Sequence, residues 1–235
     1  MNREPTTEFE SSMSRGESLA ALLYLPVHIL ALPLLLTWIM LRGWVGEAGA
    51  NLLCYALGFM YMLAFEGRFL RREFDPLCDR PGRCLLEICV SYGLMLGLNL
   101  CVNGLLTLLL PAENPNNAAI MDMAGMEMGK ISAMAVFLAP VVEELMFRGG
   151  VFGVLRRKNR VLAYAASMLL FSVYHVWGYA MAEPLYWLFI IQYLPISWLL
   201  CRCYERTGTI WTSIFLHMLV NGISLKALSM LQELM

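Results

Sequence analysis

Charge is scarce in this sequence. Only 15% of its 235 residues are charged, 17 Lys and Arg against 18 Asp and Glu, whereas 59% are hydrophobic and the mean hydropathy is +0.62. An ordinary soluble domain has about 25% charged residues, so the composition excludes that class and points to a membrane protein. The formal net charge of −1 gives no indication of a nucleic-acid partner, and we expect none.

A disulfide framework and the common zinc-protease motif are missing as well. The seven cysteines are odd in number and scattered, which favours free thiols. Cys201 and Cys203 lie two apart without a nearby third and fourth ligand, so we interpret them as packing residues. No His-Glu-x-x-His stretch occurs, and that arrangement is the one that places two zinc ligands and a base on one helix face. No internal repeat is visible, which disfavours a transporter built from repeated halves.

Apolar segments long enough to cross a bilayer of ~30 Å follow one another along the chain. They predict an all-α, polytopic transmembrane helical bundle of about seven spans, over residues 19–41, 48–65, 85–110, 131–155, 161–180, 185–200 and 209–230. The first segment exceeds the ~7–15 residues of a signal-peptide core, so we expect it to be retained. The chain then divides into a polar cytoplasmic tail (1–18), N-terminal membrane helices (19–110), an external Met-rich loop (111–130) and a membrane core with the polar motifs (131–235).

The positive residues predict the orientation, because Lys and Arg near the ends of spans stay on the cytoplasmic side. Most of them cluster after the second, fourth and sixth spans: Arg68, Arg71, Arg72, Arg80 and Arg83, then Arg156, Arg157, Lys158 and Arg160, then Arg202 and Arg206. The intervening loops hold few. We therefore expect a cytoplasmic N-terminus and an external C-terminus.

Some residues outside the main motifs also predict structure. Gly93 and Gly97 form a small-xxx-small pair, which predicts a close helix contact. His28 has no polar companion one turn away, and we interpret it as structural. Four methionines in the external loop suggest either a soft-metal site or the apolar side of an interfacial segment, and we favour the second: Met121, Met123, Met126 and Met128.

Two adjacent carboxylates and an arginine interrupt the apolar segment 139–150. An ionisable side chain inside a membrane-spanning helix costs at least ~2.5–3.5 kcal/mol on insertion scales, so it indicates a functional site. Glu144 and Arg148 are four residues apart, so on a helix they share one face and neutralise each other. A purely structural ion pair is an open alternative for these two. Glu143 points about 100° away and is free for other chemistry.

Two later spans each pair a histidine with another residue one helical turn away, Phe171 with His175 and His217 with Asn221. At a rise of ~1.5 Å per residue, Glu143, His175 and Asn221 lie about 18–21 Å from the expected cytoplasmic ends of their helices. His217 lies one turn shallower. We therefore predict that these side chains meet at one level of the bundle.

Three motifs thus occur in order: Glu143-Glu144-x-x-x-Arg148 with Phe147-Arg148-Gly149, Phe171-x-x-x-His175, and His217-x-x-x-Asn221 preceded by Glu205-Arg-Thr-Gly-Thr-Ile-Trp211. They resemble the motifs of the CPBP family of intramembrane proteases, which includes the CAAX prenyl endopeptidases, bacteriocin-processing and immunity-associated proteins, and the Abi group. The resemblance covers about residues 130–225. The first hundred residues resemble nothing in particular beyond added membrane helices.

The resemblance implies an intramembrane endopeptidase. It implies that Glu143 and His175 activate a water, that His217 and Asn221 stabilise the oxyanion, and that the remaining motif residues support them: Glu144, Arg148 and Phe171. We expect no metal cofactor. The alternative is a zinc-dependent protease with Glu143, His175 and His217 as ligands, and a membrane protein that binds a peptide without cutting it, or an immunity protein, also stays open.

The expected partners are membrane lipid and a membrane-associated or lipidated peptide or protein substrate. We expect a multi-pass protein of a prokaryotic plasma membrane, with an active site that opens toward the cytoplasmic side.

Overall fold

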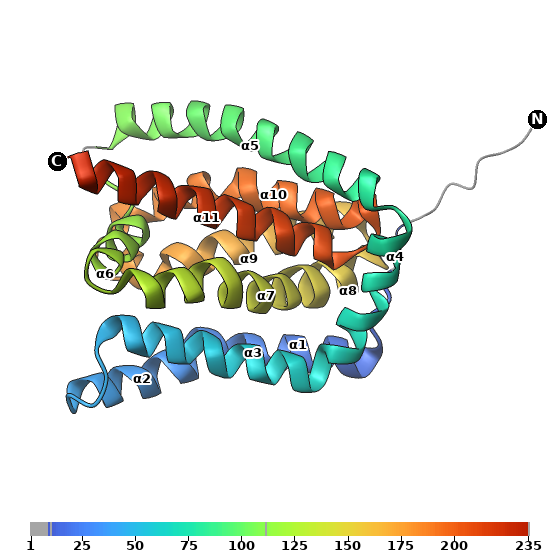
Figure 1. Cartoon of the computed structure of the whole chain (residues 1–235), viewed down its shortest axis with the longest axis horizontal. Coiled ribbons are helices and arrows are strands. Elements are labelled where there is room, and N and C mark those ends of the chain that lie inside the picture. Colours follow the sequence, from blue (N-terminus) through green and yellow to red (C-terminus); the bar gives the residue numbers. More distant parts are fainter. Residues whose placement is uncertain (1–8, 10, 111, 235) are drawn as a thin grey trace, which may run out of the picture.

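The computed structural model describes residues 9, 11–110 and 112–234, and within them the chain is helical and contains no strand. The helices lie roughly alongside one another in a bundle (Figure 1). The first three runs are α1 (Arg15–Pro26) with η1 (Val27–Ala31) and α2 (Leu32–Leu41), α3 (Glu47–Arg72) with α4 (Phe74–Asp79), and α5 (Pro81–Leu109). The all-α prediction is therefore confirmed.

The fourth run is the longest and carries the paired carboxylates. It comprises α6 (Pro115–Ser132), η2 (Ala133–Leu138), α7 (Ala139–Glu144), η3 (Leu145–Phe152) and α8 (Gly153–Arg156). Three runs follow it: α9 (Arg160–Ala180), η4 (Pro184–Phe189) with α10 (Ile190–Thr207), and α11 (Ile210–Leu234).

Five of these runs have the length and hydropathy of membrane spans: Arg15–Leu41, Glu47–Asp79, Pro81–Leu109, Arg160–Ala180 and Pro184–Thr207. Large apolar side chains point outward from several of them, such as Leu41, Leu100 and Leu108, each more than three-quarters exposed. Lipid, not water, suits such a surface. The chain is thus a multi-pass membrane bundle. Of the remaining predicted spans, 131–155 is helical along its whole length and 209–230 is helical from Ile210 onward.

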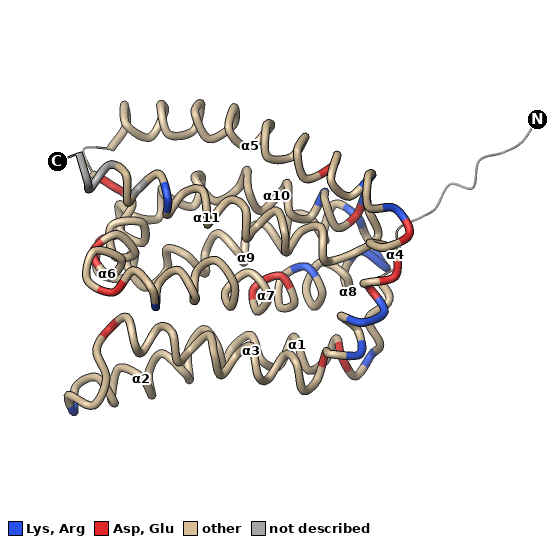
Figure 2. Tube along the Cα trace, viewed as in Figure 1, with Lys and Arg blue, Asp and Glu red and all other residues tan. Residues whose placement is uncertain are grey.

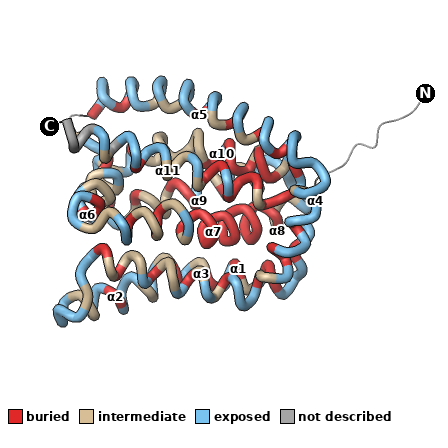
Figure 3. Tube along the Cα trace, in the orientation of Figure 1, coloured by how far each residue is buried: buried red, intermediate tan, exposed pale blue. Residues whose placement is uncertain are grey.

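The helix with the paired carboxylates lies at the centre of the bundle. Every residue of α7 and η3 is buried, and Figure 3 shows this segment as a continuous buried stretch between more exposed helices. In η3 the helix widens to π-helical turns, in which the Gly153 N–H donates to the carbonyl of Arg148, five residues earlier. Such π-helical segments occur frequently at functional sites.

The N-terminal segment differs from the predicted polar tail. The α1 helix begins at Arg15 with Ser14 as its N-cap in a capping box, and Met13 is only 2% exposed. The carbonyls of Ser11 and Met13 accept hydrogen bonds from Arg157. Residues 11–14 are therefore part of the packed base of the bundle, because their carbonyls accept hydrogen bonds from Arg157, just after α8, and from Arg72 on α3.

The predicted external loop also differs, since most of it is the α6 helix. Pro115 occupies the first turn, and the Asn114 side chain caps it by accepting from the next two backbone N–H groups, as is typical of a helix start. Met123 is buried in a cluster with Ala48 and Ile131, so its role is apolar packing. This agrees with the interfacial interpretation of the methionines and not with a soft-metal site at this residue.

Two smaller predictions have opposite outcomes. All seven cysteines are free, as expected, and Cys201 and Cys203 are fully buried packing residues. The close contact predicted at Gly93 and Gly97 is wrong, because a Cβ atom at either position would meet nothing within 4 Å. These glycines lie on the outward face of α5, which packs inward through Ser91 and Met95.

Basic residues gather at one end of the bundle. Figure 2 shows Lys and Arg concentrated around α4 and α8, whereas the end that carries α6 has few. We call the first the arginine-rich end and the second the α6 end. The positive-inside rule predicts that the arginine-rich end is cytoplasmic.

Candidate active site

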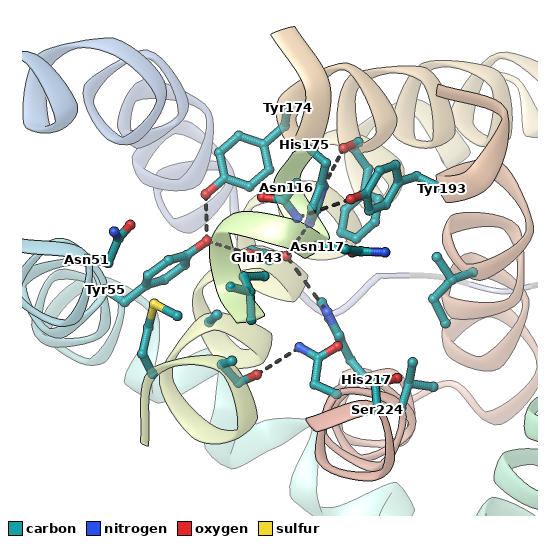
Figure 4. Close-up of a pocket in the computed structure, with 18 of the residues that line it drawn as sticks. Asn51, Tyr55, Asn116, Asn117, Glu143, Tyr174, His175, Tyr193, His217 and Ser224 are labelled. Carbon is teal, nitrogen blue, oxygen red and sulfur yellow. Dashed lines mark hydrogen bonds and ion pairs between the residues drawn. The ribbon is translucent and has the colours of Figure 1, made fainter. Parts of the chain in front are cut away.

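Glu143 lies at the end of α7, and its two carboxylate oxygens have different surroundings. The side chain is only 3% exposed. Its Oε1 accepts a hydrogen bond of 2.7 Å from the Tyr55 hydroxyl on α3. Its Oε2 has no hydrogen-bond partner among the residues that the structure describes and faces two histidines (Figure 4). A buried carboxylate oxygen without a partner is costly, so it marks the reactive side of the group.

Both histidines present the same ring nitrogen to Glu143. The Nε2 atoms of His175 on α9 and of His217 on α11 each lie 3.8 Å from Glu143 Oε2. The other nitrogen of each ring is held: His175 Nδ1 is 2.8 Å from the Phe171 carbonyl, and His217 Nδ1 is 2.9 Å from Glu144 Oε1. Because a carbonyl or carboxylate oxygen only accepts, both Nδ1 atoms carry the proton that they donate. In a neutral ring, Nε2 therefore offers a lone pair toward Glu143.

The predicted pair of Glu144 and Arg148 is present and fully buried. Arg148 Nη1 donates to Glu144 Oε1 at 3.0 Å, and both side chains are 0% exposed. The guanidinium also donates to Ser197 Oγ at 2.9 Å and stacks on the Phe171 ring, with 4.2 Å from Cζ to the ring centroid. Since Glu144 also holds His217, this cluster links α7, η3, α9, α10 and α11. The arginine thus acts through Glu144 on the orientation of His217.

A chain of hydrogen bonds reaches Glu143 from the N-terminal helices, and the sequence analysis missed it. The Tyr55 hydroxyl donates its proton to Glu143, so its oxygen accepts a hydrogen bond of 2.7 Å from the Tyr174 hydroxyl. Tyr174 in turn accepts from His28 Nε2 at 3.1 Å, and His28 Nδ1 accepts from the Tyr24 hydroxyl at 3.3 Å. Every donor in this chain then points toward the Glu143 carboxylate. Such chains of hydrogen bonds strengthen one another inside a protein.

His28 was therefore interpreted incompletely as a structural residue. It is 1% exposed and bonded at both ring nitrogens, and it lines the same cavity as Glu143. The sequence did contain one indication of this hydrogen-bonded chain, namely the tyrosines in its apolar segments. A buried tyrosine hydroxyl normally has a hydrogen-bond partner. The partner itself was hidden, since it lies on a different helix.

A cavity of about 730 Å³ gives access to these groups. It brings together the predicted site residues Glu143, Phe171, His175, His217 and Asn221. The volume falls in the range of ~300–1,000 Å³ that is common for ligand sites. Glu144 and Arg148 are not in its lining and lie behind it.

The cavity extends toward the α6 end, where Asn116, Asn117 and Ser224 contribute to its wall (Figure 4). None of the described residues that line it comes from α4 or α8. The predicted opening toward the cytoplasmic side stays a prediction, and the described lining lies away from the arginine-rich end. On that side the wholly buried η3 segment and residues 11–14 fill the space, whereas on the other side the helices leave room.

Asn221 lines the cavity, and part of its hydrogen-bonding capacity is already used within the protein. Its Nδ2 donates to the Ala135 carbonyl at 2.8 Å, which uses one of its two amide N–H groups and leaves the second. No group of three or more His, Cys, Asp and Glu residues in the described part of the chain has the arrangement of a metal site. The cavity therefore combines a carboxylate, two oriented imidazoles and a carboxamide, which suit proton transfer and oxyanion binding.

Comparison with known proteins identifies the segment that carries these groups. Residues 130–223 match the family model described as type II CAAX prenyl endopeptidase Rce1-like. The match includes all three motifs and confirms the resemblance seen in the sequence. The chain has no significant match to a curated protein or to a solved structure.

Proposed function

Because residues 130–223 belong to the Rce1-like family of type II CAAX prenyl endopeptidases, we propose that the protein is an intramembrane endopeptidase. It hydrolyses a peptide bond in a membrane-associated or lipidated peptide. Glu143 and His175 activate the water, and His217 and Asn221 stabilise the oxyanion.

The observation that carries this proposal is the position of Glu143 Oε2. It has no partner among the described residues, and the Nε2 atoms of His175 and His217 lie 3.8 Å away. That distance is too long for a direct hydrogen bond and suits one water that bonds to the carboxylate and to a ring nitrogen at once. The surrounding cavity is large enough to bring a peptide carbonyl beside that water.

The reaction follows from these positions. Glu143 Oε2 takes a proton from the water, while the His175 Nε2 lone pair accepts the second O–H and fixes its direction. The water oxygen forms a bond to the peptide carbonyl carbon, and the carbonyl oxygen becomes an oxyanion. Glu143 then gives its proton to the peptide nitrogen, the C–N bond breaks, and a carboxylic acid and an amine leave.

Two groups are suited to the oxyanion. Asn221 keeps one amide N–H free for it. His217 gives its Nδ1 proton to Glu144, so the ring atom that faces the oxyanion is Nε2, which lies 3.8 Å from Glu143 Oε2. Preorganised donors of this kind typically contribute ~2.7–4 kcal/mol each to the transition state.

A zinc-dependent reaction is the second candidate, and one observation favours it. Each imidazole faces Glu143 through Nε2 while Nδ1 is held by an oxygen, which is also how metal-bound histidines are oriented. We favour the metal-free reaction because the distances of 3.8 Å between each Nε2 and Glu143 Oε2 suit a bridging water.

The test is a cleavage assay with purified protein and a panel of lipidated and membrane-anchored peptides. We expect the wild-type protein to cleave in the presence of a strong chelator, and Glu143→Ala and His175→Ala to lose cleavage while remaining folded. Activity that disappears with the chelator and returns with zinc would establish the zinc reaction. Binding without cleavage of any peptide would instead support a peptide-binding protein.

A further inference from the structure

A second groove lies at the arginine-rich end of the bundle, apart from the cavity of the active site. It has a volume of about 350 Å³ and forms where the end of α3 and the start of α4 meet the start of α11. The described residues that line it include none of those that line the cavity around Glu143. The proposed reaction therefore leaves this groove unexplained.

The described lining of the groove contains one cation and one anion. Arg71 in the last turn of α3 and Asp75 in the first turn of α4 are both exposed. Neither forms an ion pair with another described residue, because the helix is interrupted between them at Glu73 and the i, i+4 geometry of a continuous helix does not hold. The neighbouring charges are already used: Arg72 pairs with Glu17 at 2.6 Å, and Glu73 accepts from a backbone N–H of α11 at 2.9 Å.

The part of the groove that is farther from the end of the bundle is open and apolar. A Cβ atom at Gly67 would meet nothing within 4 Å, and Leu63 is 43% exposed. Leu63 precedes Arg71 by eight residues, which places it ~12 Å deeper along α3. The groove thus leads from a pair of charges into a surface that faces the acyl chains of a membrane.

Two aromatic rings form the fixed wall of the groove. Trp211 Nε1 donates to the Leu70 carbonyl at 2.9 Å, and its ring meets the Phe74 ring edge-on, with 5.8 Å between the centroids. Tryptophan is enriched where a membrane meets water, because its ring is apolar and its N–H is polar. The wall therefore lies at the level where lipid headgroups join their acyl chains.

A phospholipid with an ethanolamine headgroup matches these groups in order. Its phosphate would accept charge-assisted hydrogen bonds from Arg71, its ammonium group would donate to Asp75, and an acyl chain would lie over Gly67. A headgroup with only negative charge would face Asp75 without a cation of its own. A choline headgroup has the cation but no N–H to donate. The pair of charges thus discriminates between lipids.

We infer that this groove is a binding site for a phospholipid with an ethanolamine headgroup. The bound lipid bridges the junction of α3 and α4 to the first turn of α11, and α11 also carries His217 and Asn221. It is a structural ligand of the bundle, and the inference holds whether or not the protein cleaves a peptide.

The direct test measures lipid binding by native mass spectrometry. Delipidated protein in detergent is titrated with three dioleoyl lipids that share their acyl chains and differ in headgroup: phosphatidylethanolamine, phosphatidylcholine and phosphatidylglycerol. We expect the first ethanolamine lipid to bind about fivefold more tightly than either other lipid, the ratio that an exposed ion pair gives at the upper end of its range. Equal binding of the three lipids, or tighter binding of phosphatidylglycerol, would overturn the inference. A protein that dimerises and binds no lipid would do the same.

Charge variants test how the headgroup is recognised. Asp75→Asn should remove the preference for phosphatidylethanolamine over phosphatidylglycerol, because the ammonium group loses its partner while Arg71 still holds the phosphate. Arg71→Gln should weaken binding of phosphatidylethanolamine about fivefold. Arg68→Gln, at an exposed arginine of the same helix outside the lining, is its control and should bind as the wild type does. An equal loss in both arginine variants would show that the general charge of this end attracts the lipid, against the inference.

A pair of glycine variants tests the apolar part of the groove. Gly67→Leu fills it, and we expect the ethanolamine lipid to lose at least fivefold in affinity. Gly93→Leu adds the same side chain at another open position, on α5 and outside the lining, and should leave binding unchanged. Wild-type binding by Gly67→Leu would overturn the inference. The melting temperature of each variant shows whether it is folded, and if Gly67→Leu is not, the variants at the exposed Arg71 and Asp75 decide.

Discussion

Replacing Arg148 by methionine tests how the active site is held together. The change keeps an apolar side chain of similar length and removes the guanidinium that pairs with Glu144. In the wild-type protein both groups are 0% exposed, and the guanidinium has further contacts with Ser197 and with the Phe171 ring. Removing one partner of a buried pair costs ~3–5 kcal/mol, because the remaining charge is left without compensation.

The structure points to the lower part of that range. His217 Nδ1 continues to donate to Glu144 Oε1 at 2.9 Å, so the stranded carboxylate keeps one partner, and we expect a loss of about 3 kcal/mol. For a chain of this size, 1 kcal/mol corresponds to roughly 2–4 °C in Tm. The expected fall in Tm is therefore about 6–12 °C, measured by differential scanning fluorimetry in detergent, with a parallel loss of cleavage.

Two further variants separate the ion pair from other effects. The double change Glu144→Gln with Arg148→Met removes both charges and should recover at least half of the lost stability, because no uncompensated charge remains. Arg68→Met removes an exposed arginine of α3 that forms no ion pair with another described residue, and it should change the Tm by no more than about 1–2 °C. A wild-type Tm for Arg148→Met would refute the reasoning.

The remaining predictions concern catalysis and orientation. Asn221→Ala should lower kcat by ~100–1,000-fold with little change in KM, because it removes an oxyanion donor; a change in KM alone would assign Asn221 to substrate binding. Tyr55→Phe removes the hydrogen bond to Glu143 Oε1 and should lower kcat by about 10–150-fold, since a hydrogen bond to a charged group contributes ~1.5–3 kcal/mol. Tyr179→Phe, at another tyrosine of the cavity lining, is its control and should retain activity. The orientation is tested in a protein whose exposed native cysteines Cys78, Cys89 and Cys101 are changed to serine. In intact cells, Asn117→Cys at the α6 end should react with a membrane-impermeant maleimide, whereas Lys158→Cys at the arginine-rich end should not. The reverse labelling would show that the α6 end is cytoplasmic.

The parts of the site that follow from single helices were predictable. Glu144 and Arg148 are one turn apart, so their pairing depends only on helical geometry, and it is present. The rise per residue predicted one level for Glu143, His175 and Asn221, with His217 one turn shallower. Both histidines face Glu143, and Asn221 lines the same cavity. Depth along a helix follows from the number of residues to its end, so it can be calculated from the sequence alone.

The parts that depend on how helices face one another were not predictable. Tyr55 bonds to Glu143 from 88 residues earlier in the chain, on a helix that carries no motif. The glycines of α5 have a small-xxx-small spacing, yet they face outward, because the spacing does not fix the rotation of the helix. The direction in which the cavity extends has the same origin, since depth alone does not say on which side of Glu143 the helices diverge.

The packed N-terminal segment has a consequence for the order in which the protein assembles. Residues 11–14 precede their partners in the chain: the Ser11 carbonyl accepts from Arg157, 146 residues later, and the Ser11 hydroxyl accepts from Tyr204, 193 residues later. Closing contacts over such separations requires that the intervening chain has already been synthesised and inserted. Residues 11–14 are therefore among the last to reach their final positions, and they seal the base of the bundle only after α10 is in the membrane.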